Sequence, residues 1–274
     1  MNMAQSTDAK SARDRCFEKM ESRFPQWERL WDRTPKLLPD FISQGFYPES
    51  TVPIGAICIT DCMHTLGAAR YALDRYCEVG EENRSIGDEP SAVFFERFYL
   101  DDVALRLYSA AEHLANGILA MLELDASAVA EFKTPSQWER VRQYLNKDQP
   151  GSNFMIALGN LRSSTAWRFT MGYRGRWVHN QPDLVAGLGI LYERKKRWQS
   201  STDGSHRVVD VGTGDAPKHS SEKLAELFGQ AFAGFLTVVE TVVDAYFIIL
   251  EDAGIRETDK GLGINIPART PADA

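Results

Sequence analysis

The chain has 274 residues, of which 43% are hydrophobic and 25% are charged, and these are the proportions of an ordinary globular protein. A chain of this length can bury a full hydrophobic core without disulfides or metal ions as supports. Its net charge of −7 excludes a generally basic nucleic-acid-binding protein. None of the four cysteines has zinc-type spacing, so we expect no metal site and no cofactor. The polar segment from Met1 to Arg15 carries no secretion signal, and a cytoplasmic location is the default expectation.

The net charge hides a local asymmetry. Residues 158–207 contain nine lysines and arginines against three acidic residues, a net charge of +6, so the rest of the chain carries −13. A basic zone on an acidic body suits a local site for a polyanion. The same zone is equally compatible with a solvated charged face whose partners come from the acidic remainder.

The first part of the chain is predicted to be helical after a disordered start at residues 1–11. Hydrophobic residues recur every three or four positions over residues 12–31, where Pro25 either divides a helix or opens a second one at its first position. Residues 35–47 are expected to form a short helix or turn between prolines. A long apolar helix is predicted over residues 51–76.

A polar stretch at residues 79–91 separates this region from the strongest predicted helix of the chain. Gly80, Gly87 and Pro90 make the stretch a break and the best candidate for a domain boundary. Residues 92–124 contain no proline and keep one apolar face. They predict a helix of roughly 50 Å that forms the spine of a bundle.

The second part of the chain is expected to contain three further helices and one hairpin. A short helix is predicted over residues 134–146, and a longer one over 153–178, with Asn153 as its cap. Residues 194–211 alternate weakly about a central Asp-Gly pair, which favours a β-hairpin. The last helix is predicted over residues 220–252, capped by one of two serines at its start.

The apolar run at residues 232–250 raises the question of a membrane. Glu240 and Asp244 lie inside it, and carboxylates at the middle of a span would each cost about 3 kcal/mol to insert. We therefore predict an amphipathic core helix and no contact with a membrane.

These elements together predict an all-α chain with one small β-hairpin. Its expected divisions are an N-terminal helical region of unknown role at residues 1–91, a helical unit at 92–255 and a disordered tail at 256–274.

The richest concentration of functional side chains lies at residues 168–182, which gather three arginines, a histidine and three aromatic residues. Arg174 and His179 are separated by four residues. Arginine holds a phosphate by a planar, permanently charged fork, and histidine transfers protons near neutral pH. The pair could cleave a phosphodiester without a metal ion.

The spacing alone has little weight, because about one Arg-x(4–6)-His match is expected by chance in this composition and the chain has two. The other match is Arg106 and His113 on the predicted spine helix. Arg106 has an internal partner in Asp102 four residues earlier, so we interpret it as structural. Arg174 and His179 lie where a helix is expected to end, which is where functional groups become exposed.

Residues five apart in a regular helix lie about 140° apart around the axis. Arg174 and His179 would then not face the same way. Either the helix loosens after Gly175, or a second chain completes the site around a two-fold axis.

Two segments carry a resemblance to a known family. They are Tyr-Leu-Asp-Asp-Val-Ala-Leu-Arg-Leu-Tyr-Ser-Ala-Ala-Glu-His at residues 99–113 and Tyr-Arg-Gly-Arg-Trp-Val-His-Asn-Gln-Pro at 173–182. Together they resemble the HEPN superfamily, most closely an uncharacterised branch of it, over roughly residues 93–252. The resemblance implies an up-and-down helical bundle that forms a homodimer through its Arg-x(4–6)-His motifs. Many such proteins are metal-independent endoribonucleases in toxin–antitoxin or phage-defence systems, with an antitoxin or sensor protein as partner.

The resemblance also implies roles for individual residues. RNA would be the substrate, Arg174 would stabilise the charge on the scissile phosphate, and His179 would be the general acid/base. The family often has a polar residue directly after the arginine, where this chain has Gly175. The candidates for that missing group are Asn180 and Glu112; Glu112 is otherwise an ordinary exposed glutamate.

The remaining basic residues of the stretch, Arg168 and Arg176, are expected to hold the RNA backbone. The alternative function is a catalytically inactive HEPN-like module that binds a partner protein or nucleic acid. The two readings differ in geometry, because an active dimer must bring two Arg174/His179 pairs together in an open cleft.

Overall fold

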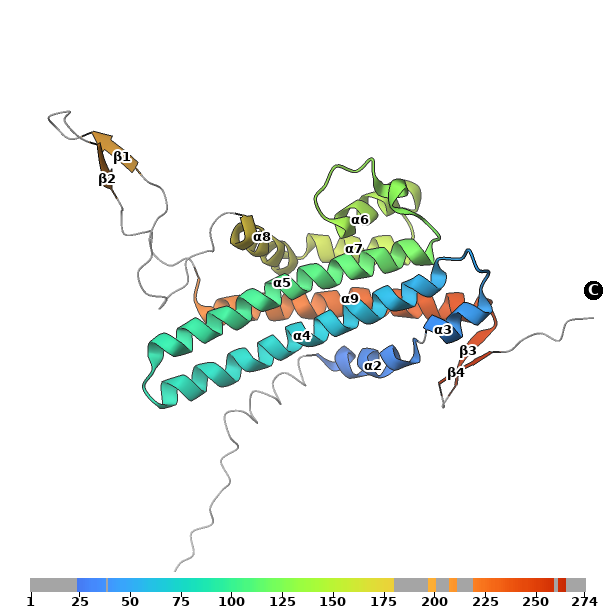
Figure 1. The fold of residues 1–274 in the computed structure, drawn as a ribbon, viewed down its shortest axis with the longest axis horizontal. Coiled ribbons are helices and arrows are strands. Elements are labelled where there is room, and N and C mark those ends of the chain that lie inside the picture. Colours follow the sequence, from blue (N-terminus) through green and yellow to red (C-terminus); the bar gives the residue numbers. More distant parts are fainter. Residues whose placement is uncertain are drawn as a thin grey trace, which may run out of the picture.

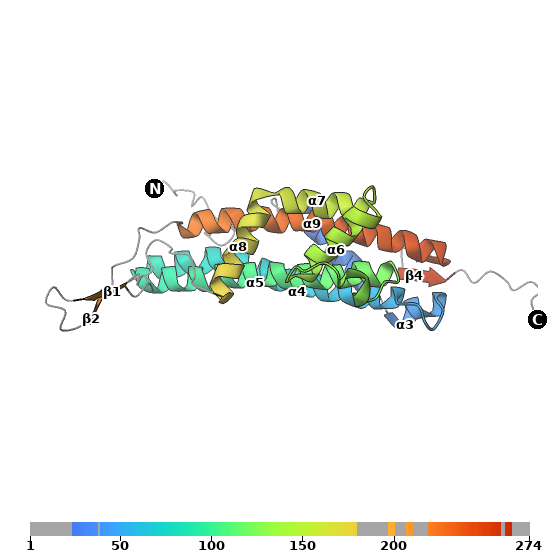
Figure 2. The same cartoon turned by 90° about the horizontal axis from the view of Figure 1, so that it is seen from above.

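Over the residues that the computed structural model describes, the protein is mostly helical, which confirms the all-α class. The described residues are 24–37, 39–179, 197–200, 207–210, 219–258 and 261–264. Three long helices, α4 (Val52–Ser85), α5 (Glu89–Met121) and α9 (Ser221–Asp252), run along the long axis of the molecule (Figures 1 and 2). Their inward faces form most of one hydrophobic core.

The polar stretch predicted as a break at residues 79–91 is instead helical at both ends. α4 continues to Ser85, α5 begins at Glu89, and only Ile86–Asp88 turn the chain. Gly87 supplies the left-handed conformation of the turn with a φ of 78°. The Asp88 carboxylate accepts a hydrogen bond from the Ser91 N–H and so caps α5. The prediction was wrong because polar residues face solvent along a protruding helical hairpin, and α4 and α5 share the same hydrophobic core.

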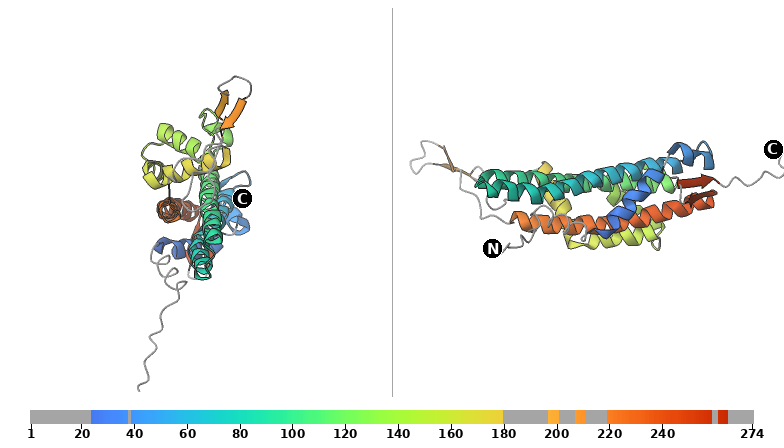
Figure 3. Two further views of the ribbon diagram at one scale, coloured as in Figure 1. Left: turned by 90° about the vertical axis from the view of Figure 1, so that its left-hand side faces the viewer. Right: turned by 90° about the horizontal axis from the view of Figure 1, so that it is seen from below.

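The first described helix, α2 (Pro25–Arg33), opens with Pro25 in its first turn, as one of the two predicted alternatives required. It is followed by the short elements η1 (Thr34–Lys36), α3 (Pro39–Ile42) and η2 (Ser43–Gly45). Trp27 and Leu30 of α2 are buried. The end-on view in Figure 3 shows that α2 lies on the opposite side of α9 from α7. The predictions for residues 1–11 and 12–23 lie outside the described residues.

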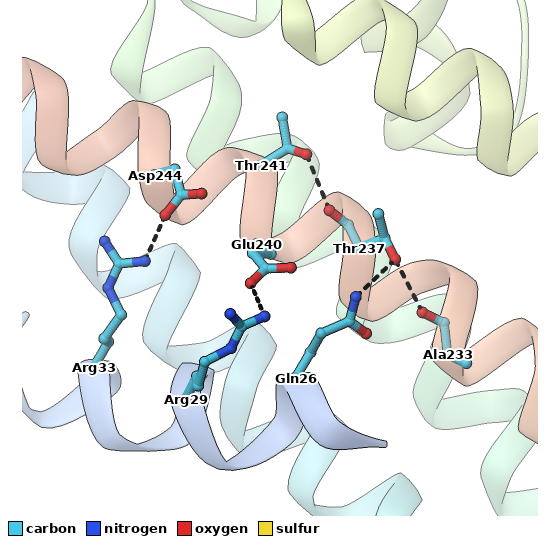
Figure 4. Close-up of polar contacts among 8 residues, drawn as sticks. All are labelled: Gln26, Arg29, Arg33, Ala233, Thr237, Glu240, Thr241 and Asp244. Carbon is cyan, nitrogen blue, oxygen red and sulfur yellow. Dashed lines mark hydrogen bonds and ion pairs between the residues drawn. The ribbon is translucent and has the colours of Figure 1, made fainter. Parts of the chain in front are cut away.

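A polar ladder joins α2 to α9 (Figure 4). Gln26 donates to Thr237 at 3.3 Å, and Arg29 donates to Glu240 at 2.5 Å. Arg33 donates to Asp244, also at 2.5 Å. All three pairs are separated by 211 positions, so the two helices run parallel in one register. Glu240 and Asp244, the two carboxylates inside the apolar run of the last helix, therefore pair with arginines of α2.

The helix predicted over residues 153–178 is two helices, α7 (Asn153–Ser163) and α8 (Thr165–His179). Ser164 leaves the helical region with φ −59° and ψ 128°, and its Oγ accepts from the Trp167 N–H at 3.4 Å. A serine competes with the helix by bonding nearby backbone, and here it starts a new helix in another direction. The cap of α7 is Ser152 rather than Asn153. Before them, η3 (Ala126–Val129) and α6 (Gln137–Asp148) follow α5, and α6 matches the predicted short helix.

The predicted hairpin is present, and a second one replaces part of the predicted tail. β1 (Arg197–Ser200) pairs antiparallel with β2 (Arg207–Asp210), while the predicted turn between them lies outside the described residues. β3 (Ile255–Thr258) pairs antiparallel with β4 (Gly261–Ile264), where disorder was expected from residue 256. The tail prediction was wrong there because Ile255 is fully buried against the core and anchors the strand.

The last helix matches its predicted bounds closely, and the Ser220 hydroxyl caps it by accepting from the Lys223 N–H. α9 and α4 are both long and apolar enough to cross a membrane by length and composition, but about half of each apolar window is buried within the protein. A core helix of a soluble protein passes the same test, so the observation is weak evidence for a span.

Candidate functional site

The candidate site lies where α8 crosses α5, a crossing visible in Figures 1 and 2. On one side of α8, the buried Tyr173 hydroxyl donates to the Asp101 carboxylate at 2.5 Å. Asp101 also accepts from the Arg97 guanidinium at 2.9 Å. Arg174, the next residue of α8, contacts Tyr108 of α5 instead. Tyr173 and Asp101 therefore fix the position of the helix that carries Arg174.

Arg174 is half-buried against α5. Its guanidinium carbon lies 3.9 Å from the centre of the Tyr108 ring, which is a close cation–π contact. Its Nε is buried and has no hydrogen-bond acceptor among the described residues. The side chain is thus held in place by stacking, with one donor left for another acceptor.

Glu112 lies one helical turn beyond Tyr108 on α5 and faces the same crossing. Its Oε2 accepts from the Gln137 N–H at the start of α6 at 2.9 Å, and its Oε1 is buried without a partner among the described residues. Burial raises the pKa of Glu112, against the opposing effects of the backbone hydrogen bonds from α6 and the charges of Arg140 and Arg174. Glu112 is therefore half-buried beside Arg174, and its interpretation as an ordinary exposed glutamate was wrong.

His179 is the last residue of α8, and only its backbone is described. α8 remains helical from Thr165 to His179, so the expected loosening after Gly175 does not occur. Regular helical geometry places the Cα–Cβ directions of Arg174 and His179 about 140° apart. Of the two alternatives, completion by a second chain stays a prediction. Asn180 lies outside the described residues.

The two substrate-binding arginines of the prediction lie on the exposed surface of α8. Arg168 lines an open pocket of about 460 Å³ between α6, α7 and α8. Arg176 is exposed further along the helix. Met171, in the wall of this pocket, precedes Arg174 by three residues, so the Arg174 contacts with α5 lie one helical turn from the pocket.

Sequence reasoning missed the contributions of Tyr108, Arg140 and Arg162. Tyr108 could have been noticed, because it lies four residues before Glu112 and shares its helical face. Arg140 and Arg162 could not have been found from the sequence, because only the packing of the helices brings Arg140 of α6 near Glu112 and Arg162 of α7 near Arg168.

A second open pocket, of about 550 Å³ between α7 and α9, has mainly apolar and neutral walls, with Asp244 as its charged residue.

The competing Arg-x(4–6)-His match is explained by a local ion pair. Arg106 Nε lies 3.2 Å from the Asp102 carboxylate one turn earlier, as predicted. Within the described residues, no group of three or more histidine, cysteine or acidic side chains is arranged to hold a metal ion.

Comparison with protein-family models, with curated proteins and with solved structures gave no match to this chain.

Proposed function

We propose that this chain is a metal-independent endoribonuclease of HEPN type that acts as a homodimer. The proposal rests on the resemblance of residues 93–252 to that superfamily. The structural observation that supports it is the state of Arg174, whose guanidinium packs on Tyr108 and whose buried Nε has no acceptor within the described ranges. A cation held in this way before substrate arrives loses little entropy on binding a phosphate.

In the proposed reaction, the 2′-oxygen of one RNA nucleotide attacks the adjacent phosphorus. His179 transfers the proton between the attacking and leaving oxygens, and the bond to the 5′-oxygen breaks. The products are a 2′,3′-cyclic phosphate and a 5′-hydroxyl end. Arg174 stabilises the negative charge that gathers on the phosphoryl oxygens, while Glu112 helps to hold the guanidinium electrostatically. Arg168 and Arg176 contact the flanking backbone, and Asn180 is a further candidate contact.

The direct test is cleavage of mixed RNA in EDTA by the wild type and by Arg174→Ala and His179→Ala. Each substitution is expected to abolish measurable cleavage. The matched controls are Arg106→Ala and His113→Ala, which remove the same residue types from the other match on α5 and are expected to leave activity intact. Equal RNA cleavage by all five proteins, or no cleavage by the wild type, would refute the proposed ribonuclease activity.

The dimer part of the proposal has its own test. If Arg174 of one protomer works with His179 of the other, a mixture of the two inactive variants forms heterodimers with one intact site. After subunit exchange the mixture is expected to recover about a quarter of wild-type activity. A mixture that stays inactive, although the subunits exchange, would contradict a composite site.

A non-catalytic binding module remains the second candidate. Its support is the packing of Arg174 against Tyr108 and beside Glu112, which also suits a purely structural arginine. In that case Arg174→Ala lowers the free energy of unfolding and leaves RNA chemistry absent in every variant. A toxin–antitoxin or defence setting, with an antitoxin or sensor partner, belongs to the first candidate and is tested by whether expression arrests growth only when His179 is intact.

A further inference from the structure

The pocket between α6, α7 and α8 is a separate feature from the Arg174 contacts. It has a volume of about 460 Å³ and is open to solvent. Its walls combine two arginines, two hydroxyl side chains and two tryptophans. The lining residues are Thr134, Pro135, Ser136, Trp138, Glu139, Arg162, Trp167, Arg168 and Met171.

Trp167 lines this pocket and carries an unpaired donor. The side chain is fully buried, stacks on Phe235 at 5.2 Å and meets the edge of Trp138 at 5.6 Å. Its indole N–H is buried and has no acceptor among the described residues. Buried donors are nearly always paired, because an unpaired one loses its hydrogen bond to water without replacement. An acceptor that enters the pocket would remove this deficit.

The charges of the pocket favour an anion as that acceptor. Arg162 and Arg168 are exposed at its rim. Glu139 is its one acidic lining residue, and two guanidinium groups share it: Arg142 at 2.8 Å and Arg162 at 3.7 Å. Arg168 has no acidic partner among the described residues and leaves one positive charge uncompensated.

The start of α6 also borders the pocket, because Ser136 at its N-cap position is one of the lining residues. The Glu112 carboxylate already accepts from the Gln137 N–H there and compensates the positive end of the helix dipole. Among the described residues, those that bring uncompensated donors to the pocket are therefore Trp167 and Arg168.

We infer that this pocket binds a phosphate group through Arg168, Arg162 and the indole N–H of Trp167. Arginine forks match the oxygens of phosphate better than any other side chain does. The pocket is large enough for a phosphate together with part of the molecule that carries it. The inference goes beyond the proposed ribonuclease, because it requires neither Arg174 nor His179 and holds for free phosphate as well as for a nucleic-acid end.

The test is calorimetric titration of the full chain with inorganic phosphate at constant ionic strength, with chloride as the control anion. Arg168→Gln is expected to weaken binding by about tenfold or more, because a charge-assisted hydrogen bond is lost. Trp167→Phe keeps the stacked ring and removes only the N–H, so weaker binding by this variant, in a protein of unchanged helicity, points to the indole donor. Arg106→Gln removes a partly exposed arginine that does not line the pocket, and this variant is expected to bind phosphate as the wild type does.

Two oligonucleotide arms identify the source of the phosphate. DNA oligonucleotides, which lack the 2′-hydroxyl, are compared with and without a 5′-phosphate so that no cleavage intervenes. If the phosphorylated strand binds more tightly than inorganic phosphate, the ligand of the pocket is a nucleic-acid end. If the two bind equally, the ligand is a free phosphate group. Both results support the inference. No saturable binding of either up to about 10 mM, or binding unchanged in both Arg168→Gln and Trp167→Phe, would overturn it. Loss of RNA cleavage with phosphate binding intact would refute the proposed function alone.

Discussion

The guanidinium carbon of Arg174 on α8 lies 3.9 Å from the centre of the Tyr108 ring on α5. This contact joins α8, which carries the Arg174/His179 motif, to α5, which lies outside that motif. It also holds a long, flexible cation in one position, with no carboxylate bonded to it in the described part of the chain.

Replacing Tyr108 with leucine tests this contact. A partly desolvated cation–π contact contributes about 0.5–2 kcal/mol, so Arg174-dependent RNA cleavage is expected to fall roughly 2- to 30-fold. Tyr108→Phe keeps the ring and is expected to stay within about twofold of the wild type. Equal losses in the two variants would show that the hydroxyl, and not the ring, positions Arg174.

Asp74 of α4 is expected to make stability depend on pH. Burial raises its pKa to about 6, while Arg70 lowers the pKa and Glu78 raises it. Because the folded pKa lies above the ordinary aspartate value of 3.8, the folded state binds more protons between these two pH values, and stability falls as the pH rises through that window. Asp74→Asn is expected to raise the free energy of unfolding by about 1–2 kcal/mol at pH 8, less than the full shift would give because solvent screens this partly exposed group, and to have little effect at pH 4.

Chemical denaturation at both pH values measures this effect. The matched control is Asp61→Asn, at an exposed aspartate of the same helix. A gain from Asp74→Asn that is the same at pH 4 and pH 8 would mean that packing, and not ionisation, causes it.

Gly80 of α4 is required by a buried glutamate on α5. A Cβ at this position would overlap Oε1 of the buried Glu96. That oxygen pairs with Arg84 at 2.6 Å, and the other carboxylate oxygen, Oε2, accepts from the Ser221 hydroxyl at 2.9 Å. Gly80→Ala is therefore expected to destabilise the protein by about 1–3 kcal/mol, although alanine favours a helix.

Gly175→Ala on α8 is the matched control for that substitution. Its Cβ would meet open space, so the same change is expected to stabilise the protein by about 0.5–1 kcal/mol. In a Glu96→Ala background, Gly80→Ala should cost less, because the overlapping atoms are gone. Urea unfolding of these variants checks the signs, and a stabilising Gly80→Ala would contradict the proposed close approach.

The ladder between α2 and α9 is expected to be uneven in strength. Arg29 is largely exposed, with 67% of its side chain accessible, and Arg29→Ala should cost less than about 1 kcal/mol. Arg33 is 23% accessible and also lies 4.2 Å from the centre of the Phe247 ring, so Arg33→Ala should cost about 1–2 kcal/mol.

The salt dependence of stability separates the ionic contribution of the ladder from the contact of Arg33 with the Phe247 ring. At 1 M salt, where the screening length is about 3 Å, the cost of Arg29→Ala should nearly disappear. The cost of Arg33→Ala should persist in part, because its contact with Phe247 is not purely ionic. Thermal unfolding in low and high salt is the measurement, and equal salt dependence of the two variants would argue against this difference.

Interactions between near neighbours in the chain were predictable from the sequence. The Arg106–Asp102 pair spans one helical turn, the Ser220 cap bonds a backbone group three residues away, and the antiparallel β1–β2 pairing needs only a short connection. The ends of long helices with polar, solvent-facing residues were harder to predict. The polar tip of the α4–α5 hairpin resembles a loop in sequence, because hydrophilic residues mark both loops and the exposed parts of long helices.

The sequence by itself determined the mostly helical class, the approximate bounds of the long helices and the residue types at the end of α8, because these depend on local periodicity and capping. Only the tertiary structure decided that Arg174 stacks on Tyr108 beside Glu112, that arginines of α2 pair with Glu240 and Asp244 of α9, and that Arg162, Arg168 and Trp167 line one pocket. Those relationships join side chains from separate helices, and their free energies depend on which faces are buried together rather than on spacing along the chain.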